Sequence, residues 1–367
     1  SIALTLLGGL GDVDSAEPSF VLWELGRMVA QNSELSSLFN AGLSDLESRL
    51  RNSDAAKEFM DKFDHFLETF GSRGPNEWET ACETWGTNPP SVLTLIDRMR
   101  LTDAHNSPKV RALELSKKRE TATLDARNEL KGFGSWLFEK ALHSSILFSQ
   151  ARERSKTTIV DLIHVARLIT RELANRTAEQ RKNAELIDLW FILESELDEF
   201  IDNPSAFDAK ISERKRVRGE LSTRIPPFIF EGKIPDPSTW PLRSAVKANN
   251  SQHAKEGQIL KGFGGCPGVA EGIAKIIKDP SDPQDLGPGD ILIAPLTDPS
   301  WTPLFVPAEA VVVNVGGQMS HAVIVSRELG MPCVVAVKDA TDIIKDGTRI
   351  RVDGATGEVT ILETPQS

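Results

Sequence analysis

The spacing of apolar residues changes part-way along this chain, and that change limits the folds open to it. From Ser19 to about Arg218 apolar residues recur at helical spacing, as in "PSFVLWELGRMVAQ". This period is typical of amphipathic helices packed on a core. From about residue 259, short Val- and Ile-rich runs such as "GDILIAP" and "AEAVVVNV" are separated by Gly, Pro and Asp, a pattern typical of strands joined by turns. We therefore expect a multi-domain chain, with an all-α domain followed by a small α/β domain.

A proline-rich stretch separates the two patterns. The segment "RIPPFIFEGKIPDPSTWPLR" contains five prolines and no helical period. Such a composition is typical of an extended connector. The sequence therefore predicts a helical domain over residues 1–218, a connector over 219–258 and an α/β domain over 259–367.

Charge and cysteine content exclude several classes of protein. The net charge of −11 disfavours a general nucleic-acid role, because phosphate binding needs a basic surface. The three cysteines have no CxxC spacing, so they indicate neither a disulfide framework nor a zinc site. No apolar run approaches the roughly 20 residues of a membrane span. We expect a cytoplasmic protein that has no nucleic-acid or membrane partner and no metal site of its own.

One histidine lies where a helix is expected to begin, in "GGQMSHAVIVSREL". Ser320 is a favoured N-cap residue, and Gly316 and Gly317 allow a tight turn out of the preceding strand. The positive end of a helix dipole disfavours imidazolium and attracts anions, so His321 should be neutral, nucleophilic and able to carry a phosphoryl group. Gly316, Gly317 and Ser320 would support that group. A surface histidine without a role is the alternative, and a ring enclosed in the interior would argue against the carrier role.

The surrounding hundred or so residues match a known family piece by piece. The matching segments, in order, are "GCPGVAEGIAKII", "LGPGDILIAPLTDPSWTPLF", "AVVVNVGGQMSHAVIVSRELGMPCVVAV" and "IKDGTRIRVDGATGEVTIL". They resemble the phosphohistidine, or swivelling, domain of phosphoenolpyruvate-utilising enzymes. The resemblance implies a β/β/α fold in which His321 accepts a phosphoryl group from an ATP-grasp domain and carries it to a second site. Met319 stands where many members have Thr, which weakens the case for pyruvate as acceptor.

The helical half carries a second resemblance. Residues 66–93 and 147–173 are similar to the helical substrate domain of rifampicin phosphotransferase and its relatives. That resemblance implies that Arg152, Glu153 and Lys156 line the place where the acceptor hydroxyl meets the phosphohistidine. Arg152 and Lys156 are four residues apart and share a helix face, so they could stabilise transferred charge, with Glu153 as base or orienter. A solvated basic helix face is the alternative.

Arg73 and Glu77 flank the turn in "FGSRGPNEWE". The resemblance favours a substrate-binding edge of a pocket. A structural ion pair across the loop is the alternative.

Together these features predict an ATP-dependent, dikinase-type phosphotransferase. The chain would hold a small acceptor with a hydroxyl group, while Mg-ATP would bind an ATP-grasp domain that is a separate subunit or lies outside this sequence. Two alternatives stay open. One is a phosphoenolpyruvate synthase-like enzyme acting on pyruvate, and the other is a non-catalytic phosphohistidine carrier or regulatory module.

Overall fold

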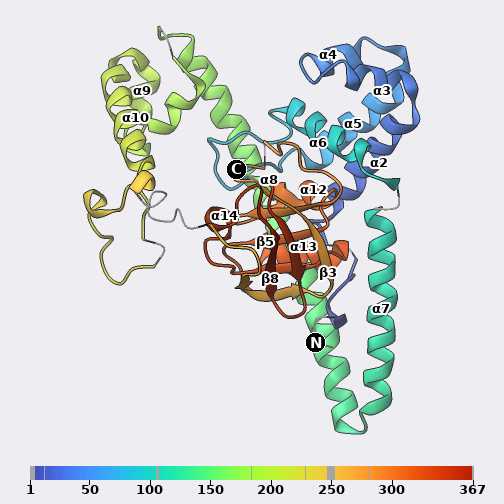
Figure 1. Ribbon diagram of the computed structural model, residues 1–367. Coiled ribbons are helices and arrows are strands. Elements are labelled where there is room, and N and C mark those ends of the chain that lie inside the picture. The colour runs from blue at the N-terminus through green and yellow to red at the C-terminus, as the bar shows by residue number, and fades with distance from the viewer. Residues whose placement is uncertain are drawn as a thin grey trace. The chain divides into compact units, whose positions relative to one another are not determined.

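The contacts within the chain define two compact units. The computed structural model describes residues 5–11, 13–104, 107–182, 184–227, 229–245, 253–280 and 282–365. The first unit comprises Ser1–Glu77, Cys82–Asp161 and Ala254–Ser367, and the second comprises Trp78–Ala81 and Leu162–His253. The helical and α/β classes of structure are both present, as predicted (Figure 1). The predicted division into 1–218, 219–258 and 259–367 stays a prediction.

Helices form the N-terminal part of the first unit. They are α2 (Glu17–Gln31), α3 (Ser33–Asn40), α4 (Leu46–Arg51), η1 (Asp54–Ala56), α5 (Lys57–Phe70), α6 (Pro89–Leu101), α7 (Pro108–Glu129) and α8 (Phe133–Ala178), whose C-terminal part continues into the second unit. The buried residues Leu22, Leu25 and Val29 of α2 recur at helical spacing, as the sequence pattern predicts. Gly26 lets α2 approach α6 closely, because an added Cβ would lie 2.9 Å from the Met99 Cβ.

The C-terminal part of the first unit is an eight-stranded mixed sheet. Its order is β1-β8-β7-β3-β4-β5-β6-β2, with parallel pairing from β3 through β6 and antiparallel pairing elsewhere. The strands are β1 (Ile259–Lys261), β2 (Phe263–Cys266), β3 (Val269–Ile276), β4 (Asp290–Ala294), β5 (Ala310–Val313), β6 (Cys333–Val335), β7 (Arg349–Asp353) and β8 (Glu358–Glu363). Its helices are η7 (Pro299–Trp301), α12 (Thr302–Phe305), α13 (His321–Leu329) and α14 (Ala340–Ile343).

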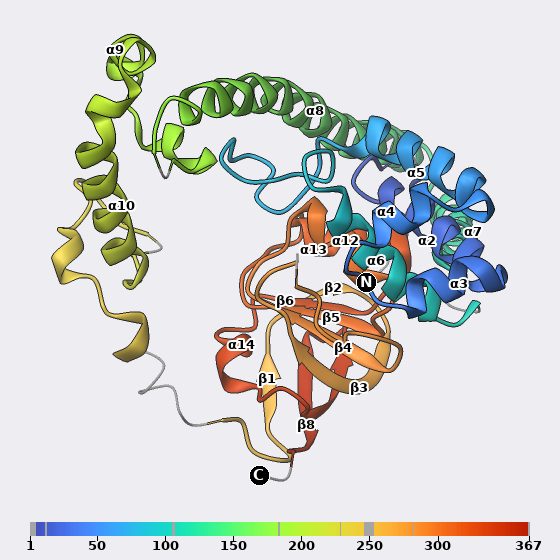
Figure 2. The same cartoon turned by 90° about the horizontal axis from the view of Figure 1, so that it is seen from above.

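The two faces of the sheet belong to different apolar cores. Along β5, Val311 and Val313 join one buried cluster while Val312 joins another, as the two-residue period of a strand dictates. The first cluster is continuous from α2, α5 and α6, through α12 and α13, to this face of the sheet. Helices α12 and α13 lie on the side of the sheet toward α2 and α6 (Figure 2). The helical and α/β parts of this unit are thus held together by shared apolar burial.

The second unit has a small core of its own. It contains the end of α8, then η3 (Leu186–Phe191), η4 (Glu194–Glu196), α9 (Leu197–Asp202), η5 (Pro204–Phe207), α10 (Asp208–Ser222) and η6 (Pro237–Thr239). Phe200 and Phe207 pack edge to face in its centre, with ring centroids 5.5 Å apart. Residues 228 and 246–252 of the predicted connector lie outside the described residues.

Membrane-spanning elements were sought throughout the part of the chain that the structure describes. None of its helices combines the length and the apolar character that crossing a bilayer requires.

One glycine after β7 provides a test of how tightly the sheet packs. A Cβ at Gly354 would lie 1.9 Å from the Cys266 carbonyl oxygen and 2.8 Å from the Cys333 amide nitrogen. Both neighbours are backbone atoms, so the sheet itself would have to shift. We expect Gly354→Ala to lower the free energy of unfolding by about 3 kcal/mol, measured by urea denaturation.

Gly287→Ala is the matched control in the same unit. The nearest heavy atom to its added Cβ is the Asp285 carbonyl oxygen at 3.7 Å, an ordinary contact. We expect a change within about 0.5 kcal/mol. Equal losses for the two variants would contradict the packing described here.

Candidate functional site

The helix that carries the histidine begins where the sequence predicts. Ser320 is the N-cap residue of α13, and Gly330 ends the helix with a left-handed φ of 69°. The Ser320 side chain makes no capping hydrogen bond, and its buried Oγ has no hydrogen-bond partner among the described residues. Gly316 lies in a tightly packed place, because an added Cβ would lie 3.0 Å from that Oγ and 3.1 Å from the Val335 Cβ. Gly317 has open space around it, so no contact explains the second glycine.

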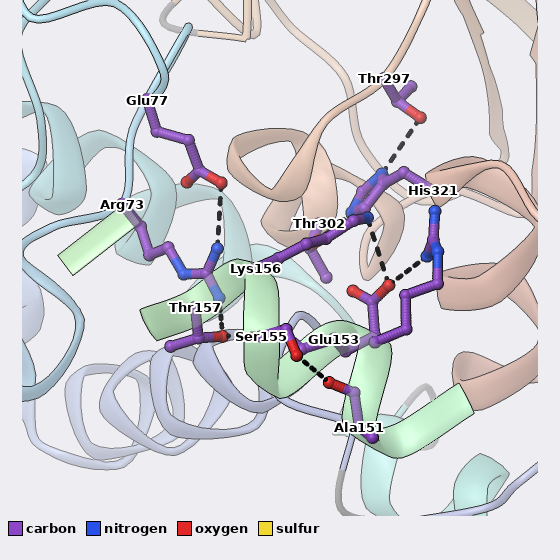
Figure 3. Close-up of polar contacts among 11 residues, drawn as sticks. Arg73, Glu77, Ala151, Glu153, Ser155, Lys156, Thr157, Thr297, Thr302 and His321 are labelled. Atoms are coloured by element: carbon purple, nitrogen blue, oxygen red, sulfur yellow. Dashed lines mark hydrogen bonds and ion pairs between the residues drawn. The ribbon is translucent and has the colours of Figure 1, made fainter. Parts of the chain in front are cut away.

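The ring of His321 is enclosed rather than placed at an open tip. The residue is 7% exposed. Its Nδ1 lies 3.2 Å from the Thr297 Oγ1, and its Nε2 lies 3.1 Å from the Thr302 Oγ1 (Figure 3). Phe305 packs edge-on against it, with ring centroids 6.1 Å apart. The expectation of an imidazole at the tip is therefore corrected: the packing that joins the α/β and helical parts of this unit covers the ring.

The charge state of the ring follows from this enclosure. Burial lowers the pKa of His321 to about 3, and the nearby positive charges of Lys156, Arg73 and Arg152 add to the effect. The imidazole is therefore neutral at physiological pH. Neutrality is what the sequence predicts, but the main cause is desolvation. Because the ring is surrounded by hydroxyls and cations, its burial differs from that of a histidine in an apolar core.

The three predicted residues of α8 form one ion-pair cluster. Glu153 is 3% exposed, and its Oε1 accepts hydrogen bonds from the Lys156 Nζ at 3.2 Å and from the Arg152 Nη1 at 2.5 Å. Figure 3 shows Glu153 and Lys156 rising from the same stretch of helix. The buried carboxylate thus holds two like charges together, which offsets their mutual repulsion. Arg154, on the same helix, is exposed.

Arg73 and Glu77 form a buried ion pair on the loop after α5. The Arg73 Nη1 lies 2.9 Å from the Glu77 Oε1, and the side chains are 3% and 1% exposed. The Arg73 Nη2 donates a hydrogen bond to the Thr157 Oγ1 of α8 at 2.6 Å, which ties this loop to the ion-pair cluster. Burial raises the pKa of Glu77 to about 7; Asp298 adds to this, and Arg73 opposes it. Arg73 and Glu77 thus form the structural ion pair that was the alternative interpretation of this loop. A role of the two residues in substrate binding stays a prediction.

A small cavity adjoins the cluster. It has a volume of about 20 Å³, and among its lining residues are Arg152, Glu153, Met319, Ile324 and Leu10. A cavity of this size has room for about one water molecule. The cavity therefore has no room for a larger molecule in this conformation.

An N-terminal segment, residues 5–11, covers this cavity and binds the far end of α13. We call it the strap. The amides of Leu10 and Gly11 donate hydrogen bonds to the two carboxylate oxygens of Glu328, at 3.0 and 3.1 Å. The Gly9 amide donates to the Arg327 carbonyl oxygen at 3.1 Å. The strap also accepts hydrogen bonds from Arg119 of α7 and Gln150 of α8. It thus joins α13 to both long helices.

The residues around His321 do not suit a magnesium ion. Within the described ranges, no group of three or more His, Cys, Asp or Glu side chains is arranged to hold a metal. The two predicted carboxylates near the ring already accept hydrogen bonds from cations: Glu153 from Arg152 and Lys156, and Glu77 from Arg73. The local charge favours an anion instead.

The sequence does not predict that Thr297 and Thr302 contact the ring of His321. Both lie in the segment "LTDPSWT", which was part of the family resemblance. No spacing rule relates a threonine in a loop to a histidine about twenty residues later. The two threonines contact the ring because β5 and the turn after it place α13 beside α12.

Two family models match separate parts of the chain. The model described as rifampicin phosphotransferase fourth domain matches residues 1–153, and the model described as PEP-utilising enzyme, mobile domain, matches residues 286–357. The first range includes Arg73, Glu77, Arg152 and Glu153, and the second includes His321.

Relatives align over most of the chain. An uncharacterized phosphotransferase of Bacillus subtilis, YvkC, is 25% identical over 95% of this chain and 42% of its own length. The rifampicin phosphotransferase of the same organism is 30% identical over 84% of this chain and 35% of its own. That of Streptomyces sviceus is 28% identical over 88% and 37%. The chain thus spans well under half the length of these relatives. The two family models and these alignments show that the chain is similar, over most of its length, to part of the rifampicin phosphotransferases and to the mobile domain of phosphoenolpyruvate-utilising enzymes.

Proposed function

We propose that this chain is the acceptor-binding and phosphohistidine portion of a phosphotransferase. His321 takes up a phosphoryl group that originates from ATP and delivers it to a hydroxyl of a small organic acceptor beside α8. The observation that carries the proposal is the neutral ring of His321 set among Lys156, Arg73 and Arg152.

The charge balance around the ring supports an anionic guest. Three cations, Lys156, Arg73 and Arg152, act on the ring, and three carboxylates lie near them: the ion-pair partners Glu77 and Glu153, and Asp298, which interacts with Arg73. Burial raises the pKa of both Glu77 and Asp298, which weakens their compensation of this positive charge and favours an additional anion. A phosphoryl group on His321 supplies that anion. The same cations would stabilise the charge that develops as the group passes to the acceptor.

Glu153 is suited to accept the proton of the acceptor hydroxyl. It is buried, lies next to the cavity, and is oriented by Arg152 and Lys156. A carboxylate fixed in this way can orient a hydroxyl and accept its proton as the oxygen attacks phosphorus. Arg73 and Glu77 hold the opposite loop against α8 through Thr157 and thereby form the edge of the site.

The enclosure of His321 by itself argues against a carrier role, and the proposal therefore requires that this conformation is the delivery state. A ring covered on both nitrogens cannot meet a nucleotide, so loading requires the α/β part to separate from the helical part. We propose that Mg-ATP is held by an ATP-grasp domain on another chain or in another part of the protein, and that residues 219–258 allow the movement. The closed cavity must open in the same movement to admit the acceptor.

The names of the relatives suggest an acceptor to try first. Several are rifampicin phosphotransferases. Rifampicin is therefore the first candidate, and pyruvate is the probe for the phosphoenolpyruvate synthase-like alternative. If neither rifampicin nor pyruvate accepts the phosphoryl group from His321 and a protein does, the carrier alternative is supported.

Loading and delivery should separate by mutation. Phosphoramidate should phosphorylate His321 in the unsubstituted protein, as located by peptide mass spectrometry, and His321→Ala should lack that phosphorylated position while its other histidines react as before. Arg152→Ala and Lys156→Ala should load normally but deliver about 10²–10³-fold more slowly to a competent acceptor, because each removes a charge that stabilises the transferring group.

Arg154→Ala is the control for a lost positive charge on α8. Its side chain is exposed, so loading and delivery should both match the unsubstituted protein. If no phosphoryl group is found on His321 in the unsubstituted protein, or if Arg152→Ala and Lys156→Ala deliver at the normal rate, the site assignment is wrong.

The lowered pKa of His321 also predicts how stability depends on pH. The folded ring stays neutral down to about pH 3, whereas an unfolded histidine gains a proton near 6.5. This contribution to stability is therefore present above pH 6.5 and is lost as the pH falls, by up to about 1.4 kcal/mol per pH unit. Urea unfolding at pH 7, 6 and 5 should show a steeper loss for the unsubstituted protein than for His321→Gln.

Glu77 acts in the opposite direction and must be separated from this effect. Its raised pKa of about 7 favours the folded state at low pH, and that contribution is lost as the pH rises from 4.5 through 7. Because both proteins in the comparison keep Glu77, it cancels in the difference. Parallel curves for the two proteins would show that the ring is not held neutral.

A further inference from the structure

A second cavity of the first unit lies against the strap. It has a volume of about 120 Å³, whereas the cavity at the ion-pair cluster has about 20 Å³. Thr5 and Gly8 of the strap line it, together with Lys118 of α7, Cys266 at the end of β2 and Arg327 of α13. A space of this size holds several water molecules or one small ion.

Arg327 is a buried cation whose partners are neutral. The residue is 5% exposed. Its Nε donates a hydrogen bond to the Gly265 carbonyl oxygen at 3.0 Å, and its Nη2 donates one to the Gln318 Oε1 at 2.9 Å. Among the residues that the structure describes, no carboxylate forms an ion pair with it. A buried guanidinium without a carboxylate is costly, and burial accordingly lowers the pKa of Arg327. An anion in the cavity would reduce that cost.

Lys118 adds a second positive charge to this cavity. Its side chain is exposed, and within the described ranges it forms no ion pair. Burial raises the pKa of the Cys266 thiol to about 11, whereas Arg327 and Lys118 both act to lower it. The two cations therefore act on the same part of the cavity lining.

One carboxylate lies nearby, and the strap already occupies it. Glu328 raises the pKa of the Cys266 thiol, so its charge reaches this region. Its two oxygens accept hydrogen bonds from the amides of Leu10 and Gly11, and it lines the smaller cavity instead of this one. The described residues that line the larger cavity thus include two cations and no acidic side chain.

We propose that this cavity binds a small oxyanion, of the size of phosphate or acetate, between Arg327 and Lys118. A guanidinium group presents several N–H donors to the oxygens of one anion, and an ammonium group adds a concentrated charge. The site is separate from His321. Arg327 follows six residues later on α13, about 9 Å along the helix axis and about 120° around it.

A bound anion would tie the strap more firmly to α7 and α13. Thr5 brings a hydroxyl to the lining, and a hydroxyl can donate a hydrogen bond to an anion. The strap also covers the small cavity beside Glu153, so an occupied anion site would hold that cover in place. This last consequence rests on the proposed function, but the binding of the anion does not.

Titration calorimetry with inorganic phosphate and with acetate tests the binding, in a buffer that contains no other oxyanion. We expect at least one of the two to bind with a Kd below about 1 mM. Binding of phosphate alone would identify a tetrahedral anion, and binding of acetate alone would identify a carboxylate. If neither reaches that affinity, the inference is wrong.

Lys118→Ala tests where the anion binds. Lys118 is the residue to change, because Arg327 also holds Gly265 and Gln318 and its loss would disturb their packing. We expect the Kd to rise about tenfold, since one charge-assisted hydrogen bond is lost.

Lys117→Ala is the matched control. It removes an exposed positive charge from the preceding residue of α7, which does not line the cavity, so the Kd should not change. Equal effects of the two substitutions, or no effect of Lys118→Ala, would contradict the proposed site.

Hydrogen exchange of the strap gives a local readout. The anion should slow amide exchange in residues 5–11 of the unsubstituted protein and of Lys117→Ala, as followed by mass spectrometry of peptides. At the same anion concentration the protection should be weaker in Lys118→Ala. An anion that binds without slowing exchange in the strap would lie elsewhere, and the inference would fail.

One further variant separates this inference from the proposed function. Arg152→Ala should leave anion binding at the strap unchanged. If Arg152→Ala abolishes anion binding and Lys118→Ala does not, the anion lies beside His321, so the inference fails and the proposed function gains support. If the anion binds as expected but His321 is never phosphorylated, the inference stands and the proposed function fails.

Discussion

A single buried carboxylate makes the arrangement of charge in this protein possible. Glu153 accepts hydrogen bonds from Arg152 and Lys156, so two cations can stand together beside a ring that carries no charge. Without that carboxylate, the two cations, both only partly exposed, would repel each other. The neutral histidine depends on the same environment, because burial and positive charge both oppose its protonation. The neutral state of the proposed nucleophile and the cations around it thus depend on the same surroundings.

The apolar packing of the first unit sets a requirement on any large movement. One buried cluster includes Leu22 and Phe63 of the helical part together with Val323 of α13 and Val311 of the sheet. Separating the α/β part would expose that surface to water at a cost of about 25 cal/mol for each square ångström. A loading state must therefore replace much of this burial with other contacts. A nucleotide-binding partner that covers the same surface of α13 would do so.

The sequence predicts the outline of this protein better than the details of its site. Sequence patterns and short motifs predict the change from helical to strand periodicity, the position of α13 from Ser320 to Gly330, and the family resemblance. The family models confirm the resemblance. Motifs record which residues are close along the chain. They do not record that α8 packs beside the ring, so the burial of His321 and the hydroxyls of Thr297 and Thr302 could not be predicted. Those contacts depend on tertiary packing among residues separated by 19 to 24 positions or more.

The strap has a consequence for sequence variation. Its attachment to Glu328 uses the amides of Leu10 and Gly11, and every residue type except proline carries that donor. Glu328 therefore recognises the path of the strap's backbone. Gly9 and Gly11 determine that path with φ angles of 57° and 68°. One acidic side chain at the end of a helix can hold a segment of almost any composition, provided that the segment bends in the right place.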